Sequence, residues 1–141
     1  MKFIFYFFIV QKNSIIKNSD NSGISLLRCI EVLNKNRQSK LLDFIKFSIK
    51  KFSKFKKRRV VKVKKSLIYK GIILSVNFFI QRKNGFFLKF DQIKSIGFQN
   101  DKLLGTRLKG NVFKELKLLN HTNKKKSDLI RKIFLKTKFI F

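Results

Sequence analysis

Apolar and polar residues alternate most clearly in the stretch DFIKFSIKKF (43–52). In an extended chain, Ile45 and Phe47 point to one side, whereas Lys46 and Lys50 point to the other. A period of two is typical of a strand with one face in a core and the other in water. The pattern therefore predicts a half-buried strand that carries Lys46 and Lys50 on its exposed face.

Four further segments are rich in apolar and β-branched residues and are typical of strands: IVQKNSII (9–16), ISLLRCIEVL (24–33), RVVKVKK (59–65) and LIYKGIILSVNFFIQ (67–81). In the last of them, Gly71 is a candidate for a bend or bulge. Several short strands separated by turn residues favour a small barrel. The fold class expected for the chain is therefore mainly β.

A hairpin is predicted in FFIQRKNGFFLKF (78–90), where Asn84-Gly85 separates two apolar runs. That dipeptide suits a type I′ turn, because both central residues of the turn need positive φ. The tip is basic, with Arg82, Lys83 and Lys89. Such a tip is either a solvated hairpin end or an arm that reaches into an RNA groove.

The pattern changes near the C-terminus. GTRLKG (105–110) indicates a turn, and NVFKELKLL (111–119) has apolar residues near helical spacing. A polar linker, NHTNKKK (120–126), precedes SDLIRKIF (127–134), for which we expect a helix with Ser127 as its N-cap. A short helical tail is thus expected after the strands.

The chain opens with MKFIFYFFIV, an apolar run that is too short for a membrane span of about 20 residues. No small-residue cleavage site follows it, so we expect neither a secretion signal nor membrane insertion.

Charge changes this picture more than any single motif. The chain has 35 Lys and Arg against 7 Asp and Glu, a formal net charge of +28. A polyanion is the obvious partner, and nucleic acid is the commonest one. The densest basic cluster is KFKKRRVVKVKK (54–65), which contains Arg58 and Arg59. It is either a solubilising loop or a set of phosphate contacts, and the scarcity of acidic residues favours phosphate contacts.

Catalytic and metal-binding patterns do not stand out. The acidic residues are scattered singly, and the chain has one cysteine, Cys29, and one histidine, His121. Cys29 lies in an apolar segment and is expected to be buried and structural. We therefore expect no enzyme activity, no cofactor and no metal site.

The composition also suggests where the gene resides. The chain has neither alanine nor proline, whereas Phe, Ile, Lys and Asn abound. Residues with A/T-rich codons are favoured, which indicates an A/T-biased genome such as that of an organelle.

Five ordered blocks resemble the universal ribosomal protein L-fourteen family of the large subunit. They are NSDNSGISLLRCIEVL (18–33), DFIKFSIK (43–50), KVKKSLIYKGIIL (62–74), RKNGFFLKFD (82–91) and GTRLKGNVFKEL (105–116). The chain departs from the family where two arginines usually follow the Asp-Asn-Ser-Gly turn. Ser25 and Leu26 stand there, with Arg28 nearby.

The resemblance implies a five-stranded β-barrel with a small C-terminal helical part. Aligned on the family blocks, the chain divides into an N-terminal apolar extension (1–9), a β-barrel body that binds rRNA (10–104), and a C-terminal turn with short helices (105–141). It implies a structural role in translation: binding large-subunit rRNA, contacting proteins of the L-three and L-nineteen families, and bridging to small-subunit rRNA. A mitochondrial ribosome is the expected compartment, with a plastid or an A/T-rich bacterial cytoplasm as alternatives. A basic barrel that binds nucleic acid outside the ribosome and a cationic membrane-surface protein are the competing functions.

The residues expected to carry these roles fall into two groups. The expected rRNA-binding side chains are Arg28, Lys46, Lys50, Arg58, Arg59, Lys62, Lys64, Lys65, Arg82, Lys83, Lys89 and Arg107. The expected turn residues are Asp20, Asn21, Ser22, Gly23, Asn84, Gly85, Gly105 and Gly110.

Overall fold

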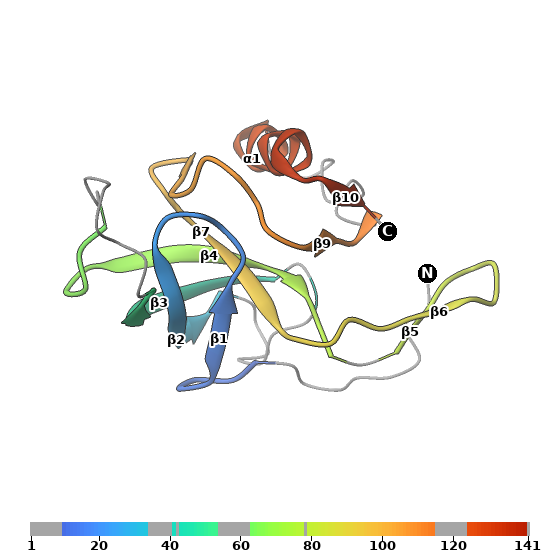
Figure 1. Ribbon diagram of the computed structural model, residues 1–141, viewed down its shortest axis with the longest axis horizontal. Coiled ribbons are helices and arrows are strands. Elements are labelled where there is room, and N and C mark those ends of the chain that lie inside the picture. Colours follow the sequence, from blue (N-terminus) through green and yellow to red (C-terminus); the bar gives the residue numbers. More distant parts are fainter. Residues whose placement is uncertain are drawn as a thin grey trace.

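The computed structural model describes residues 10–33, 41, 43–53, 63–77, 79–114 and 124–140. Its elements are β1 (Ile15–Asn18), β2 (Ile24–Val32), β3 (Phe44–Phe52), β4 (Ile68–Ser75), β5 (Ile80–Gln81), β6 (Phe87–Leu88), β7 (Lys94–Gln99), β8 (Lys102–Leu103), β9 (Asn111–Val112), α1 (Lys124–Lys136) and β10 (Phe139–Ile140) (Figure 1). The expectation of a mainly β fold is confirmed.

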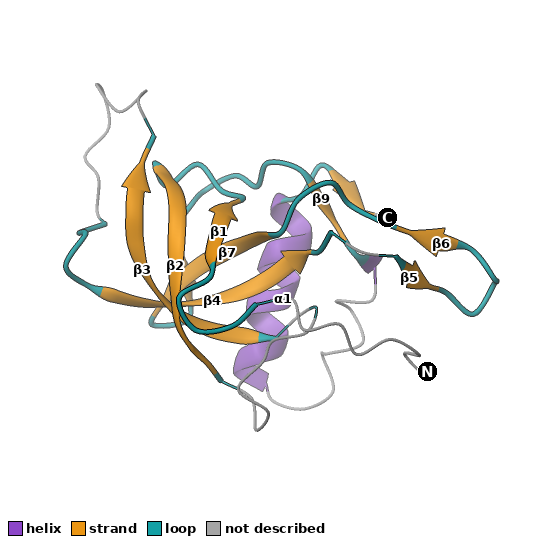
Figure 2. Ribbon diagram, turned by 90° about the horizontal axis from the view of Figure 1, so that it is seen from below, coloured by secondary structure: helices purple, strands orange, loops and turns teal. Residues whose placement is uncertain are grey.

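The five longer strands form a closed barrel. Strands β1, β2, β3, β4 and β7 pair in that order, each antiparallel to the next, and β1 closes the circle by pairing parallel to β7 (Figure 2). β8 continues the antiparallel pairing beyond β7. Closure leaves the barrel strands without an open edge between β1 and β7. The five-stranded barrel implied by the family resemblance is therefore confirmed.

The alternation predicted for residues 43–52 is confirmed in β3. Ile45, Phe47 and Ile49 are buried in the barrel, whereas Lys50 is exposed. The same interior takes up Cys29, whose side chain has no exposed surface. Burial raises the pKa of the Cys29 thiol, so the neutral form is favoured, as expected for a structural cysteine.

Two glycines make room for the ring of Phe47. Gly71 on β4 and Gly97 on β7 are register partners. A Cβ at Gly71 would lie 2.9 Å from Phe47 Cε1, and one at Gly97 would lie 2.7 Å from Phe47 Cζ. Of the bend or bulge suggested at Gly71, the bulge is wrong, because the register stays regular there and shifts between Ile73 and Ser75. Gly71 serves close packing instead.

The C-terminal helix α1 covers the outside of β4 and β7 (Figures 1 and 2). β4 is buried on both faces, with Ile73 in the barrel and Ile72 beneath the helix. Ile130 and Ile133 of α1 pack against this outer face, so a second hydrophobic core lies between the helix and the barrel. The two cores explain why β4 reads as a continuous apolar run rather than an alternating one.

The expected C-terminal details need correction. α1 begins at Lys124, so Ser127 lies within the helix and is not its N-cap, and part of the expected linker is helical. Residues 111–112, expected in a helix, form β9 and pair in parallel with β10. The rest of the helix expected over 111–119 lies mostly outside the described residues.

The hairpin exists, but its turn differs from the predicted one. β5 pairs with β6, and the Arg82 backbone N–H donates to the Phe86 carbonyl at 2.9 Å. Gly85 has a φ of 79°, whereas Asn84 is not among the described residues with positive φ. A type I′ turn needs positive φ at both central residues, so that prediction is wrong. The loop has three residues and only its glycine is left-handed.

Two other strand expectations are only partly met. The first strand begins at Ile15 rather than at residue 9. In the segment 59–65, the described residues 63–65 are not part of a strand. Residues 1–9 and His121 lie outside the described residues. Within the described ranges, no helix is long and apolar enough to cross a membrane.

Candidate RNA-binding surface

Two loops that are far apart in the sequence dock on each other at one end of the barrel. Asn21 Oδ1 accepts hydrogen bonds from the backbone N–H groups of Thr106 at 2.8 Å and Arg107 at 3.0 Å. The Asn21 amide donates to Thr106 Oγ1 at 2.8 Å, and its backbone N–H donates to the Arg107 carbonyl at 3.2 Å. We call residues 19–23 with 105–109 the loop clamp. It joins two turn motifs that the sequence presents separately.

The first loop of the clamp is shaped by its own side chains. Asp20 Oδ1 accepts from the Ser22 backbone N–H at 2.9 Å and from the Ser22 hydroxyl. The Asn18 amide donates to the same Asp20 oxygen and to the Ile24 carbonyl. This is the local side-chain-to-backbone bonding that Asp and Asn supply in turns. It holds Asn21 in the position that reaches the second loop.

Close backbone approach fixes the second loop. A Cβ at Gly105 would lie 2.6 Å from Asp20 Cβ, so only glycine fits there without movement. The Ser19 hydroxyl donates to the Lys109 carbonyl, and the Lys109 N–H donates to the Ser19 carbonyl at 2.6 Å. The clamp is therefore bonded along its whole length.

The loop clamp presents cations to solvent. Arg107 and Lys109 are both exposed. The Lys136 ammonium, at the end of α1, donates to the Gly105 carbonyl at 3.0 Å. Lys94 Nζ lies 3.1 Å from the point that a Cβ on Gly110 would occupy. Of Arg107, Lys109, Lys136 and Lys94, only Arg107 was among the expected RNA-binding residues. Nothing local in the sequence brings Lys94 and Lys136 to these turns.

The outer face of the barrel carries a second group of cations. Arg28 lies opposite Ser48, and Lys46 lies opposite Lys70 in the strand register. Arg28, Lys50 and Lys70 are exposed. Lys70 was missed at the sequence level, although it lies in the expected strand 67–81.

Lys46 differs from its neighbours because it already has an acidic partner. Its ammonium lies 2.8 Å from Glu31 Oε2. The hydrogen bond from Lys46 lowers the pKa of the exposed Glu31 carboxyl. Part of the Lys46 charge is thus neutralised by Glu31, within the protein itself.

The basic stretch before β4 is described only in part. Lys64 and Lys65 are exposed, and the Lys64 backbone N–H donates to the buried Tyr69 hydroxyl at 2.9 Å. This bond ties the stretch to the barrel core. The expected sites Arg58, Arg59 and Lys62 lie outside the described residues.

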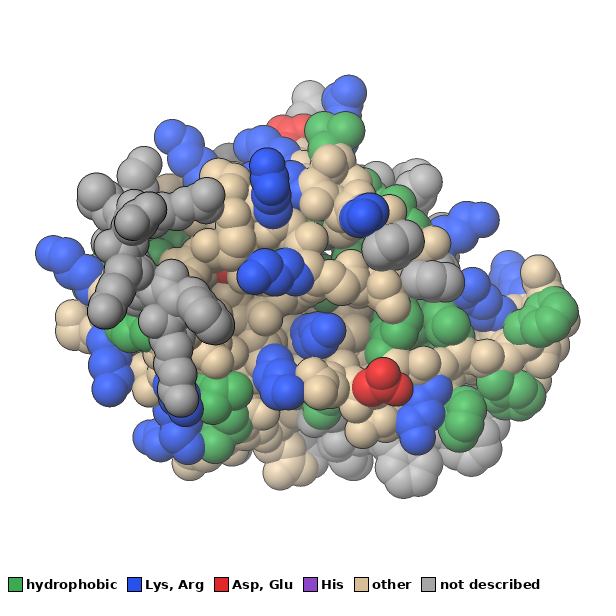
Figure 3. Space-filling model, in the orientation of Figure 1, with side chains coloured by type: hydrophobic (Ala, Val, Ile, Leu, Met, Phe, Trp, Pro, Cys, Tyr) green, Lys and Arg blue, Asp and Glu red, His purple; other side chains and the backbone are tan. Residues whose placement is uncertain are grey.

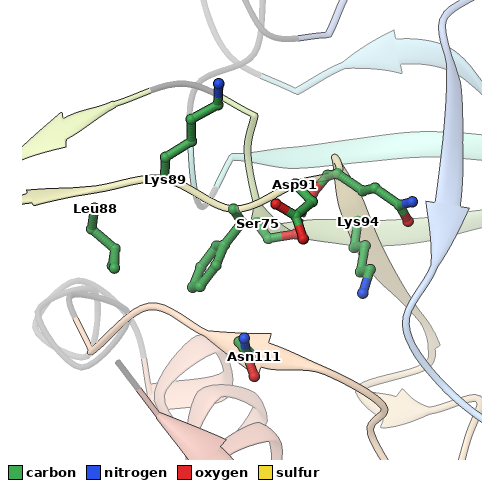
Figure 4. Close-up of a pocket in the computed structure, with 8 residues that line it drawn as sticks. Ser75, Leu88, Lys89, Asp91, Lys94 and Asn111 are labelled. Atoms are coloured by element: carbon green, nitrogen blue, oxygen red, sulfur yellow. Dashed lines mark hydrogen bonds between the residues drawn. The ribbon is translucent and has the colours of Figure 1, made fainter.

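The hairpin, which we call the arm (residues 79–89), projects from the barrel (Figures 1 and 2). Lys83 and Lys89 are exposed on it, and Arg82 is half-buried. At its base lies a hollow of about 420 Å³ lined partly by Ser75, Lys89, Asp91, Lys94 and Asn111 (Figure 4). This hollow lies between the arm, β7 and β9, and its lysines bring charge from the arm toward the loop clamp.

Positive charge dominates the face drawn in Figure 3, where Lys and Arg side chains are spread over the barrel and few acidic ones are visible. Within the described part of the chain, no group of three or more His, Cys, Asp or Glu residues could hold a metal ion. A rigid barrel coated with cations can neutralise phosphates.

Fold and surface together define a class: a small, highly basic β-barrel protein built to bind a polyanion. Residues 9–129 match the family model described as Ribosomal protein L14p/L23e. The chain is 31% identical over 112 residues to "Large ribosomal subunit protein uL14" of Carsonella ruddii (strain PV), covering 77% of this chain and 88% of that protein. The chain therefore belongs to the ribosomal protein L14 family, whose members are structural, non-enzymatic proteins of the large ribosomal subunit.

Proposed function

We propose that the chain binds large-subunit rRNA through two of its basic surfaces, the loop clamp and the arm. The observation that supports this most strongly is the clamp itself. Asn21 holds the backbone of Arg107 in place, so the cation is presented from a fixed loop rather than from a free one. A pre-ordered cation loses less conformational entropy when it meets a phosphate.

The outer barrel face adds cations whose backbone is fixed, because their strands are paired on both sides. Arg28 and Lys50 lie on the central strands β2 and β3. Phosphate contacts of this kind position a protein on RNA without reading its bases. Shape fitting and charge neutralisation are thus the proposed mechanism, as suits recognition of folded RNA.

The family suggests partners and a compartment that we also propose. They are neighbouring proteins of the L-three and L-nineteen families, a bridge to small-subunit rRNA, and a mitochondrial ribosome. The absence of alanine and proline from the chain supports an organellar gene. A plastid or an A/T-rich bacterial cytoplasm would leave the same compositional mark. The division into 1–9, 10–104 and 105–141 remains a prediction.

Sedimentation of a tagged chain from cell extract tests the proposal. We expect recovery with the large subunit through a high-salt wash, and release after treatment with ribonuclease. A chain that binds nucleic acid elsewhere would stay out of the subunit fraction. A chain that acts at a membrane surface would pellet with vesicles and be indifferent to ribonuclease.

A further inference from the structure

The arm has one apolar side that nothing in the described structure covers. Ile80 pairs with Leu88, and Gln81 pairs with Phe87. Side chains alternate along strands, so Phe87 points away from the side that carries Ile80 and Leu88. Ile80 is 4% exposed and packs in the barrel core, whereas Phe87 is 61% exposed. The arm thus has an anchored side and a free aromatic side.

Three phenylalanines make up this free side and the adjoining turn. Phe79 is 63% exposed and Phe86 is 74% exposed, beside Phe87. The Phe79 and Phe87 rings meet edge to face with centroids 6.4 Å apart. Figure 3 shows hydrophobic side chains gathered at the end of the view where the arm lies, next to Lys and Arg. A cluster of exposed phenylalanines leaves apolar surface in water at a cost in free energy, so this cluster indicates a binding surface.

The surroundings of the rings favour RNA as the occupant. Lys89 Nζ lies 5.2 Å from the centroid of the Phe79 ring, and Lys83 is exposed in the turn. Aromatic rings interleaved with cations are how proteins hold unpaired bases and their phosphates. A second copy of this chain would bring another +28 against the same surface.

We propose that Phe79, Phe86 and Phe87 stack on unpaired bases of an RNA, while Lys83 and Lys89 hold the adjoining phosphates. This inference rests on the proposed rRNA binding and extends it from phosphate contact to base contact. The rings accept any base, because every base has a face on which to stack. The arm would therefore recognise a loop, bulge or end rather than a duplex.

The test compares two probes that carry equal phosphate charge. The full chain is titrated with a 12-nucleotide single-stranded RNA and with an abasic oligonucleotide of the same length. The triple variant Phe79→Leu, Phe86→Leu, Phe87→Leu keeps apolar side chains but removes the rings. We expect its Kd for the RNA to rise about tenfold or more, since stacking contributes about 1–3 kcal/mol per base. Its Kd for the abasic probe should not change.

Leu135→Ala is the matched control, because Leu135 is 78% exposed on α1, away from the arm. It should bind both probes as the parent does. A triple variant that keeps its affinity for the RNA, or loses affinity for both probes equally, would overturn the stacking proposal. If the parent itself bound neither probe, the proposed function would fail instead.

A crosslinking experiment covers the case of a protein occupant. Phe86→p-benzoylphenylalanine places a photoreactive group on the arm of the full chain in assembled large subunits. We expect crosslinks to RNA. Crosslinks to protein alone would overturn the proposal and assign the aromatic side to a protein neighbour.

Discussion

Asn21 links the two loops of the clamp through both atoms of its side-chain amide. Asn21→Ala leaves two backbone N–H groups of the second loop without their acceptor. We expect the free energy of unfolding to fall by about 0.5–1.5 kcal/mol, the net contribution of a typical hydrogen bond, because these N–H groups are exposed and water can replace the Asn21 oxygen. The Arg107 loop should also become less ordered, which lowers rRNA affinity beyond the loss of stability.

Chemical denaturation and an rRNA-binding titration measure the two effects. Asn77→Ala, at an exposed position in the turn after β4, is the control and should change neither. If Asn21→Ala behaved like this control, the clamp would not be what positions Arg107.

Glu31 and Lys46 form an exposed ion pair, and this pairing holds the pKa of the Glu31 carboxyl below its ordinary value of 4.5. A depressed carboxyl pKa adds stability above the ordinary value, and that stability is lost as pH falls through the folded-state pKa. Both groups are exposed, so the effect on folding is small. Lys46→Met should raise the Glu31 pKa toward 4.5 in a carboxyl NMR titration. An unchanged titration midpoint would show that Lys46 does not engage Glu31 in solution.

At the scale of elements, the barrel depends on β4 and β7 approaching the Phe47 ring without side chains between them. A Cβ on Gly97 would lie 2.6 Å from Leu104 Cδ1 as well as against the Phe47 ring. Gly97→Ala should therefore cost about 1–3 kcal/mol through overpacking. Thermal or denaturant unfolding measures this loss.

A double substitution tests the cause of that loss. Phe47→Leu shortens the side chain that an alanine at Gly97 would strike. The pair Gly97→Ala and Phe47→Leu should be less destabilising than the sum of the two single changes, because the sites touch. Strict additivity would locate the strain elsewhere.

Sequence patterns predicted only some of the barrel strands well. β7 (Lys94–Gln99), which closes the barrel on β1, was not predicted, and β1 is shorter than the expected strand. β2 and β3 appear within a residue or so of their expected limits. β9 could not be predicted, since residues 111–112 become a strand only by pairing with β10, far along the chain. The Asn84-Gly85 dipeptide predicted the hairpin correctly but not its turn type, because the loop has three residues instead of two.

The sequence predicted individual residues of the candidate site, but not which of them lie together in the fold. Arg107 and the Asp20–Gly23 turn were identified separately, and only tertiary contacts unite them. Lys94 and Lys136 were not predicted, because only the fold brings Lys94 beside Gly110 and Lys136 onto the Gly105 carbonyl. The aromatic side of the arm was also missed, since a run of Phe residues in an A/T-biased chain does not reveal which rings stay exposed.

For the whole molecule, the dominant property is a charge of +28 on a closed frame. Reversing charge together at Arg58, Arg59, Lys62 and Lys64 should weaken rRNA association and leave the barrel folded. Released counterions make such binding salt-dependent, so the variant should also show a shallower salt slope. Far-UV circular dichroism checks the fold, and incorporation into subunits checks binding. If incorporation into subunits were unchanged, these four residues would not be RNA contacts.

The central claim is that the folded frame positions cations of the loop clamp on large-subunit rRNA. The most direct measurement is the fraction of chain that stays with the large subunit through a high-salt wash, for the parent and for Arg107→Glu with Lys109→Glu. We expect the parent to remain bound and the folded double variant to be washed off. Equal retention of both, or a parent found free of the subunit, would contradict the claim.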